Sequence, residues 1–203
     1  MAYSDFTVTK FEQRFNIRQT RAELFAQPIR AVQPSALLTD TISSAERMPL
    51  FSEKAKSEML IAPILLEILR QNDFRFTIFS GFSFDIDPPA GLNGLCDFLL
   101  STEPDSIEIK APVFCIVEAK NRTVEEGIGQ CAAEMYAARL FNAASEKPTP
   151  VVYGTVTNAY DWVFLRLEEQ TLTVDRERYY LGDLPRLLGV LQTIVGFYRY
   201  DWP

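Results

Sequence analysis

Apolar residues recur at helical spacing in the run SEKAKSEMLIAPILLEILRQND, which spans residues 52–73. Steps of three and four place on one stripe Ala55, Glu58, Ala62, Leu65 and Leu69. This spacing predicts an amphipathic helix, with Glu58 as a carboxylate on a largely apolar face. Pro63 lies inside the run, so we expect the helix to kink there or a second helix to begin. Glu67 is the alternative acid of this helix, because its neighbours at helical spacing are also largely apolar.

Strict alternation follows in FRFTIFSGFSFDID, residues 74–87, and predicts one long strand. Its apolar face comprises Phe74, Phe76, Ile78, Phe82, Phe84 and Ile86. Gly81 is the candidate position for a bulge. Two further strands, residues 94–101 and 112–120, come after a short turn each, so the three strands are expected to form a meander.

The second half of the chain begins with a T-x-x-E pattern at Thr123 and Glu126, which predicts a capping box for an Ala-rich helix over 127–144. Strands are expected over 149–157, 161–169 and 171–176, followed by a last helix over 183–200. The fold class is therefore mixed α/β. Its core is expected to be a helix, a three-strand meander, a helix and a strand, extended by a β-hairpin and a C-terminal helix.

Residues 1–50 show the weakest periodicity of the chain. Thr9 and Glu12 are expected to cap a short helix through Phe15. The prolines at positions 28, 34 and 49 predict that the following stretch is loop and short turns. We therefore expect an N-terminal arm, 1–50, that packs on a single domain formed by 51–203.

Composition narrows the chemistry that this domain can perform. The chain has 203 residues, of which 47% are hydrophobic, and it contains no histidine. Catalytic triads with histidine, histidine bases and histidine-containing zinc sites are thereby excluded. The three cysteines, at positions 96, 115 and 131, form no CxxC pair and are expected to be buried thiols. Carboxylates, lysine, tyrosine, serine or cysteine must carry any reaction.

Net charge and hydropathy indicate the binding partners and the cellular location to expect. A net charge of −7 argues against general polyanion binding, which depends on Lys and Arg contacts to phosphate, but leaves room for a local basic surface. No uncharged run approaches the roughly 18 residues of a membrane span, and the first residues include acids where a signal peptide would be apolar. We expect a cytoplasmic protein with no membrane contact.

Three residues on two predicted strands form the strongest candidate site. Glu118 and Lys120 share one face at the end of an apolar strand, and Asp97 interrupts the apolar strand before it. Neighbouring strands of a meander would bring the two carboxylates within about 6 Å, a span that one cation can bridge. Together with the backbone carbonyl of Ala119 they could hold Mg²⁺ or Mn²⁺, which lowers the pKa of an attacking water. Lys120 could orient or deprotonate that water.

The same residues carry a family resemblance. Glu58 in a helix, Asp97 in a strand, Glu118-Ala119-Lys120 in the next strand and Gln130 in the following helix resemble the PD-(D/E)XK nuclease superfamily. The resemblance covers residues 52 to about 170. This segment is also similar to the N-terminal nuclease domains of type I restriction subunits. Cys96 stands before Asp97 where the family name has proline.

The resemblance implies a restriction-endonuclease-like fold and Mg²⁺-dependent hydrolysis of nucleic acid, with DNA favoured over RNA. In that reading Asp97 and Glu118 bind the metal, Lys120 serves the water and Glu58 assists. Gln130 approaches the metal or a substrate phosphate. Whether the chain acts alone, as a homodimer or with a partner subunit is left open.

Several alternatives accompany these assignments. Asp85 and Asp87 are the rival acidic pair to Asp97. Glu134 lies one helical turn after Gln130. Either of these two is a site residue or simply a polar residue of the helix. The basic residues of the arm and of the motif region either form a positive rim or are scattered; they are Arg14, Arg18, Arg21, Arg30, Lys110, Lys120, Arg122 and Arg139. The alternative function is a catalytically silent module of the same fold, used for binding or assembly.

Overall fold

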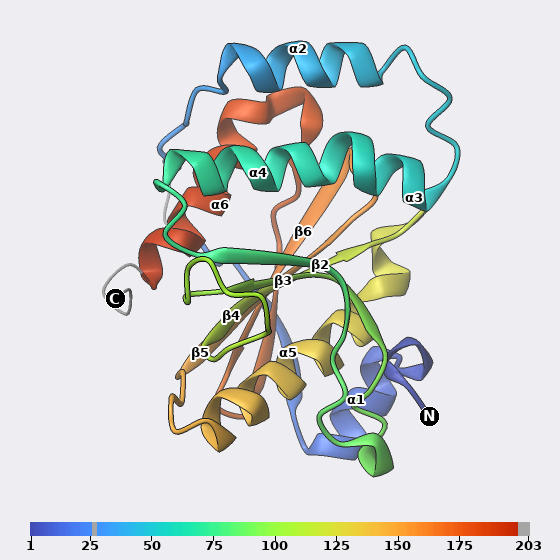
Figure 1. Cartoon of the computed structure of the whole chain (residues 1–203). Helices are drawn as coiled ribbons and strands as arrows, with labels where there is room; N and C mark the ends of the chain where they lie inside the picture. The colour runs from blue at the N-terminus through green and yellow to red at the C-terminus, as the bar shows by residue number, and fades with distance from the viewer. Residues whose placement is uncertain (26–27, 199–203) are drawn as a thin grey trace.

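The computed structural model describes residues 1–25 and 28–198. Within them the chain folds into an open eight-stranded mixed sheet with helices on both faces (Figure 1). The strands are β1 (Arg18–Ala22), β2 (Thr77–Ser83), β3 (Leu95–Ser101), β4 (Val113–Ala119), β5 (Val151–Thr157), β6 (Asp161–Glu168), β7 (Thr171–Asp175) and β8 (Tyr179–Tyr180). The helices are α1 (Val8–Phe15), α2 (Ala36–Ala45), α3 (Glu53–Lys56), α4 (Ala62–Gln71), α5 (Ile128–Ala144) and α6 (Leu184–Phe197). The predicted mixed α/β class is confirmed.

The strand order is β1-β7-β6-β5-β4-β3-β2, with β8 paired to β6. β2, β3 and β4 form the predicted antiparallel meander. Helix α5 then crosses over and returns the chain to β5, which pairs with β4 in parallel. β5, β6 and β7 continue as antiparallel neighbours. β4 therefore lies inside the sheet, and all seven of its residues are buried.

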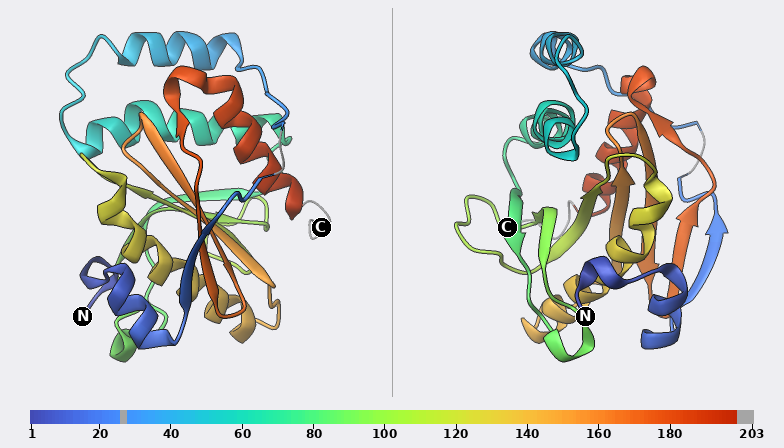
Figure 2. Two further views of the ribbon diagram at one scale, coloured as in Figure 1. Left: turned by 180° about the vertical axis from the view of Figure 1, so that it is seen from behind. Right: turned by 90° about the vertical axis from the view of Figure 1, so that its right-hand side faces the viewer.

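Two hydrophobic cores lie on opposite faces of the sheet (Figures 1 and 2). One packs α4 and α6 against the sheet, and α2 covers α4 from outside (Figure 2); its members include Leu38, Leu60, Ile64, Ile68, Phe114, Val117, Phe164, Leu187 and Leu191. The other packs α1 and α5; its members include Phe11, Leu99, Ile116, Ala132, Ala133, Met135, Val152 and Leu165. The sheet is thus covered on both sides, which explains the near-continuous apolar sequence of its inner strands.

The helix predicted over 52–73 is interrupted. A π-helical turn, Ser57–Ile61, separates α3 from α4, and Pro63 lies in the first turn of α4, so a second helix does begin there. The π turn changes the number of residues per turn, and with it the phase of the buried face. Leu60, Ile64 and Ile68 are buried, whereas Glu58 is exposed. The prediction that Glu58 lies on the apolar face is wrong for this reason.

The strand predicted over 74–87 is shorter than expected and does not keep one apolar face. Phe76 and Ile78 join the core under α4, Phe84 joins the core under α5, and Phe82 is largely exposed. Gly81 adopts φ +68°, a conformation that glycine enters without strain and that disturbs the alternation. The pairing register with β3 is the same before and after this glycine, so no residue is inserted and the expected bulge is not there.

The N-terminal region contains more structure than its sequence predicts. Helix α1 is capped by Thr7, whose hydroxyl accepts the Lys10 N–H, so the predicted cap at Thr9 is wrong. Glu12 instead accepts the N–H of Gln19, at 2.7 Å. β1 then pairs in parallel with β7, at the edge of the sheet away from β2.

The proline-containing stretch after β1 is not only loop, because helix α2 occupies part of it. Its cap is Ser35, whose hydroxyl accepts the Leu38 N–H. The side chain of Glu67 in turn accepts both the N–H and the hydroxyl of Ser35 at 2.8 Å. A single acid of α4 therefore holds the start of α2.

The second half of the chain follows its predicted order. Thr123 makes no side-chain capping bond, because Val124–Gly127 forms a short 3₁₀ turn and α5 begins only at Ile128; the predicted capping box is wrong. A Cβ at Gly129 would lie 2.4 Å from the Phe6 carbonyl oxygen, so the N-terminal segment packs directly on the first turn of α5. The last two residues of the predicted final helix, 199–200, lie outside the described residues.

All three cysteines are buried and free, as predicted. No helix in the described ranges is both long and apolar enough to cross a membrane.

Candidate functional site

Asp97 and Glu118 meet across β3 and β4. Phe98 pairs with Val117, and the two acids lie one step further along this antiparallel ladder. The Asp97 carboxylate accepts the Ala119 N–H at 2.7 Å and is within side-chain hydrogen-bond reach of the Glu118 carboxyl group. The structure therefore brings the predicted pair together on the face that packs against α5.

Lys120 continues a row of contacting polar side chains that begins with Asp97 and Glu118. Its ammonium nitrogen lies 2.6 Å from Glu118 Oε1 and donates to Gln130 Oε1 at 3.0 Å. The backbone N–H of Lys120 donates to the Thr157 carbonyl, which holds the residue at the end of β4. About a fifth of the lysine side chain is exposed, so solvent reaches this end of the row.

The row continues into α5. Gln130 Nε2 donates to Glu134 Oε1 at 3.1 Å, one turn further along the helix. Glu134 has no exposed surface. The order of contacts is thus Asp97, Glu118, Lys120, Gln130 and Glu134. The sequence placed Glu134 beside Gln130, but only the packing of α5 on the sheet shows that it is buried.

Burial dominates the electrostatics of the two glutamates. Desolvation and then the nearby Asp97 charge raise the pKa of Glu118 to about 8, despite the Lys120 ammonium. Desolvation and then Glu118 raise the pKa of Glu134 well above its usual range. Desolvation also raises the pKa of Asp97, although the Ala119 N–H and Lys120 oppose the shift. One ammonium is therefore shared among more acids than it can neutralise.

The pKa of Lys120 is raised as well, but for a lysine this favours the charged form. Its own desolvation lowers its pKa, but the Glu118 charge and hydrogen bond outweigh this effect, so the net pKa is raised. Lys120 is accordingly a protonated ammonium over the physiological range. It acts at this site as a cation and a hydrogen-bond donor.

Two carboxylate oxygens are left without partners inside the described structure. Glu118 Oε2 and Glu134 Oε2 are buried and accept no hydrogen bond. Such an oxygen beside a second carboxylate suits a hard divalent cation, which would stabilise both charged forms. No group of three or more His, Cys, Asp or Glu side chains in the described ranges could hold a metal ion. A cation held here would have two carboxylate ligands, Asp97 and Glu118, and would need backbone oxygen and water to complete its coordination.

Glu58 is not part of this site. Its side chain is 52% exposed and pairs with Lys54 at 3.2 Å. The helix acid whose charge acts on Glu118 and Lys120 is Glu53, five residues earlier. Lys56 of the same short helix donates to the Asn121 carbonyl and so ties α3 to the loop after β4. The assignment of Glu58 is corrected, because the π turn rotates it away.

The rival acids have local structural contacts. Asp85 accepts the Ser83 hydroxyl at 2.7 Å and the Gly94 N–H at 2.9 Å. Asp87 accepts the Ala90 N–H at 3.1 Å, at the start of a 3₁₀ turn. With Glu67 bound to Ser35, all three acids stabilise turns or helix ends.

The basic residues considered above do not form one rim. Lys110 precedes β4 and Lys120 follows it, so the strand separates them by roughly 23 Å at about 3.3 Å per residue. Arg139 contacts the Glu169 carbonyl beside the start of β5, at the same remote end as Lys110. The scattered arrangement is the one observed for these members of the set.

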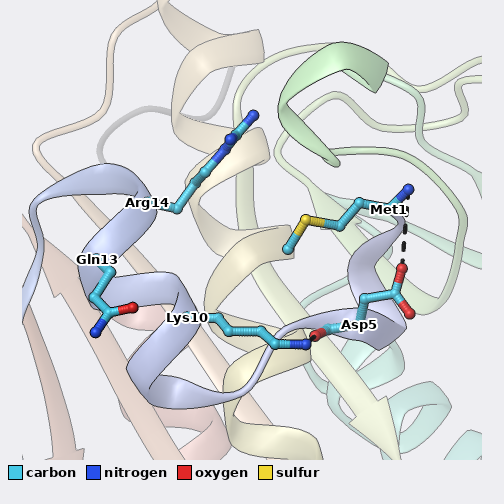
Figure 3. A pocket seen from close by; sticks show the side chains of 5 residues that line it. All are labelled: Met1, Asp5, Lys10, Gln13 and Arg14. Atoms are coloured by element: carbon cyan, nitrogen blue, oxygen red, sulfur yellow. Dashed lines mark hydrogen bonds and ion pairs between the residues drawn. The ribbon is translucent and has the colours of Figure 1, made fainter.

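A smaller basic group lies on the α5 face of the molecule. A pocket of about 620 Å³ is lined by Met1, Asp5, Lys10, Gln13 and Arg14 (Figure 3). Lys10 Nζ donates to the Asp5 carbonyl at 2.9 Å, and Arg14 donates to the Pro89 carbonyl at 3.1 Å. α1 packs on α5, whose first turn carries Gln130.

Comparison with known proteins adds no relative. The sequence matches no protein-family model, and no curated protein is significantly similar to it, so a functional assignment depends on the geometry of Asp97, Glu118 and Lys120.

Proposed function

We propose that this chain is a divalent-cation-dependent phosphodiesterase that cleaves nucleic acid, with DNA favoured over RNA. The observation that supports the proposal is the juxtaposition of Asp97 and Glu118 across the β3–β4 ladder, where Asp97 accepts the Ala119 N–H and Lys120 lies 2.6 Å from Glu118. These residues lie on or directly after two strands of the meander. The chain around them runs helix, three-strand meander, helix and parallel strand, the order that the PD-(D/E)XK resemblance implies.

Asp97, Glu118 and the Ala119 carbonyl would hold Mg²⁺ or Mn²⁺. The fit is favourable because Glu118 has a buried oxygen with no partner and because the two acids repel each other when both are ionised. Mg²⁺ takes oxygen ligands and keeps several waters, so two carboxylates suffice. When bound, such a cation acts as a Lewis acid and lowers the pKa of a coordinated water.

Lys120 would act on the reacting groups. An ammonium has three protons to donate, and Lys120 directs two of them to Glu118 and Gln130. The third can reach a water or a phosphate oxygen at the partly exposed end of the row. There it would orient the nucleophile or offset the negative charge that develops on the phosphorus oxygens.

The second candidate is a catalytically silent module of the same fold. It is favoured by the direct Glu118–Lys120 pair, which satisfies both charges in part, and by the small number of acidic ligands. In this reading the acids are held largely protonated and the row serves packing. Metal binding separates the two candidates.

The test combines Mn²⁺ binding by calorimetry with cleavage of duplex DNA, single-stranded DNA and RNA. Asp97→Asn and Glu118→Gln should each weaken Mn²⁺ binding and reduce cleavage by at least about 100-fold. Glu58→Gln is the matched control, since it removes one exposed acid of the preceding helix. No Mn²⁺ binding and no cleavage by the wild-type chain would favour the silent module.

A further inference from the structure

Glu134 is the most deeply buried acid of the row, and the proposed metal site does not use it. Its side chain has no exposed surface. Its Oε1 accepts from Gln130, and its Oε2 has no partner in the described structure. A buried carboxyl group with an orphaned oxygen destabilises a fold. In a helix whose neighbouring buried residues are Ala133, Met135 and Ala137, an apolar side chain would pack at lower cost.

The contact with Gln130 shows what the acid does. A glutamine amide has an acceptor end and a donor end, and rotation by about 180° about its last torsion exchanges them. The Lys120 ammonium only donates, so the amide oxygen must face it. The amide nitrogen must then face Glu134, which offers an acceptor. The acceptor at Oε1 is available whether or not Glu134 carries a proton, so this arrangement does not depend on its titration.

Removing that acceptor would leave the contact with Lys120 alone to orient the amide, which would then rotate more readily. In the rotated form the NH₂ group would face the ammonium, and two donors would repel each other. Lys120 would then lose one of the two groups that hold its nitrogen beside Glu118. Among the hydrogen bonds of the described residues, only those with Lys120 and Glu134 hold the Gln130 amide in place.

We propose that Glu134 is a positioning residue that orients the Gln130 amide and, through it, holds the Lys120 ammonium against Glu118. The catalytic consequence rests on the proposed nuclease function. The positioning itself does not, because it concerns contacts within the chain.

The test uses four variants: Glu134→Met, Glu134→Gln, Gln130→Ala and the double variant Gln130→Ala/Glu134→Met. Methionine has a similar length and no strong acceptor, whereas glutamine retains an acceptor oxygen. Glu134→Met should lower kcat about 10-fold with KM nearly unchanged, as expected when a catalytic group is misplaced. Glu134→Gln should stay within about 3-fold of the wild type. In the Gln130→Ala background, Glu134→Met should change kcat by less than about 2-fold, because the two residues act in series.

Stability distinguishes positioning from packing. Glu134→Met removes a buried orphaned oxygen, so its melting temperature should equal or exceed that of the wild type while activity falls. A loss of stability that parallels the loss of activity in both Glu134→Met and Glu134→Gln would overturn the proposal. So would an equal effect of Glu134→Met with and without Gln130.

An NMR measurement decides the point without any enzyme assay. The side-chain NH₂ signals of Gln130 are identified by their loss in Gln130→Ala, and the Lys120 ε signals by their loss in Lys120→Met. Both sets should shift in Glu134→Met and stay near their wild-type positions in Glu134→Gln. Unshifted Lys120 signals in Glu134→Met would refute the positioning role. Shifted signals in a chain that cleaves nothing would refute only the nuclease proposal.

Discussion

The Lys120 ammonium and a divalent cation would compete for the same carboxylate, because Lys120 lies 2.6 Å from Glu118 Oε1. Lys120→Met should therefore leave Mn²⁺ affinity unchanged or raise it by up to roughly 10-fold, since a nearby positive charge is removed. Cleavage should fall by at least about 100-fold, because the donor to the water or phosphate is lost. Calorimetry and a cleavage assay on the same preparation measure the two effects.

Lys54→Met is the matched control for this prediction. Lys54 also pairs with a glutamate, Glu58, but its side chain is 82% exposed. It should alter neither quantity. A Lys120→Met protein that cleaves at the wild-type rate would show that the ammonium has no part in the reaction.

The buried acids make stability depend on pH. The pKa of Glu118 is raised to about 8 from 4.5, first by desolvation and then by Asp97. The folded chain therefore holds more protons than the unfolded chain between these values, and stability must fall as pH rises through this window. Glu134 acts in the same direction. Glu67 and Glu125, whose pKa values are lowered, act only below the window.

Without divalent cations the melting temperature should drop by roughly 5 °C or more between pH 5 and pH 8.5, since one pKa unit is worth about 1.4 kcal/mol. Glu118→Gln should flatten the curve, and Mn²⁺ should restore stability mainly at the upper end. Differential scanning calorimetry in EDTA and in Mn²⁺ measures this. A flat wild-type curve would contradict the assigned burial of these charges.

The positions of site residues could be predicted from the sequence where the residues lie on strands or directly after them. Asp97, Glu118 and Lys120 interrupt or end apolar strands, and period-two geometry then decides their face. Glu58 could not be placed, because a π turn cannot be read from apolar spacing. Glu53 carries no signal of its own in sequence. Its approach to Glu118 depends on how α3 meets the loop after β4.

At the scale of elements, Asn142 joins α5 to β4. Its Oδ1 accepts the Val113 N–H at 2.7 Å, and its Nδ2 donates to the Val113 carbonyl at 2.8 Å and to the Thr149 hydroxyl at 2.9 Å. The Asn142 amide thus binds both the N–H and the carbonyl of Val113, as the backbone of a neighbouring strand would. Asn142→Ala should lower the free energy of unfolding by about 2–4 kcal/mol, because it leaves a buried donor and acceptor unpaired.

Urea unfolding monitored by circular dichroism measures this loss. Ser145→Ala, an exposed change at the end of the same helix, should stay within about 0.5 kcal/mol of the wild type. An equal loss in the two variants would show that helix propensity, and not the Asn142 contacts, is responsible.

The order of elements from α4 to α6 was predictable, because long apolar runs and turns punctuate that part of the chain. β1 was not predictable, because its sequence RQTRA shows no alternation of apolar and polar residues. It takes its conformation from pairing with β7. The capping boxes failed at Thr9 and Thr123 for a related reason. A cap motif is satisfied only if the helix begins beside it, and the packing of α1 and α5 moved both starts.

On the scale of the whole molecule, an acidic chain that cleaves nucleic acid as proposed would need a local basic surface to bind phosphate. Lys10 and Arg14 of α1 line one pocket (Figure 3), and α1 packs on α5. If this pair contacts the substrate backbone, Lys10→Ala/Arg14→Ala should weaken DNA binding and reduce the slope of log Kd against log salt by about 2. Fluorescence anisotropy with a labelled duplex across a salt series measures both.

Lys110→Ala/Lys147→Ala serves as the control pair, with the same change of charge near the start of β4, because Lys147 donates its N–H to Asn142, whose side chain binds Val113. Equal slopes in the two double variants would mean that only net charge matters. A slope lowered in the control alone would place the substrate on the other end of the molecule.

The pairing of β1 with β7 has a consequence during synthesis. Arg18 and its partner Thr171 are separated by most of the chain, yet they lie side by side in the finished sheet. At roughly 5–20 residues per second, the ribosome needs on the order of 10–30 s to reach β7 after β1 has been made. Through that interval the first strand has no partner. The edge of the sheet is therefore completed only late in translation or after it, and premature chains that stop before residue 171 should expose this segment to proteases and chaperones.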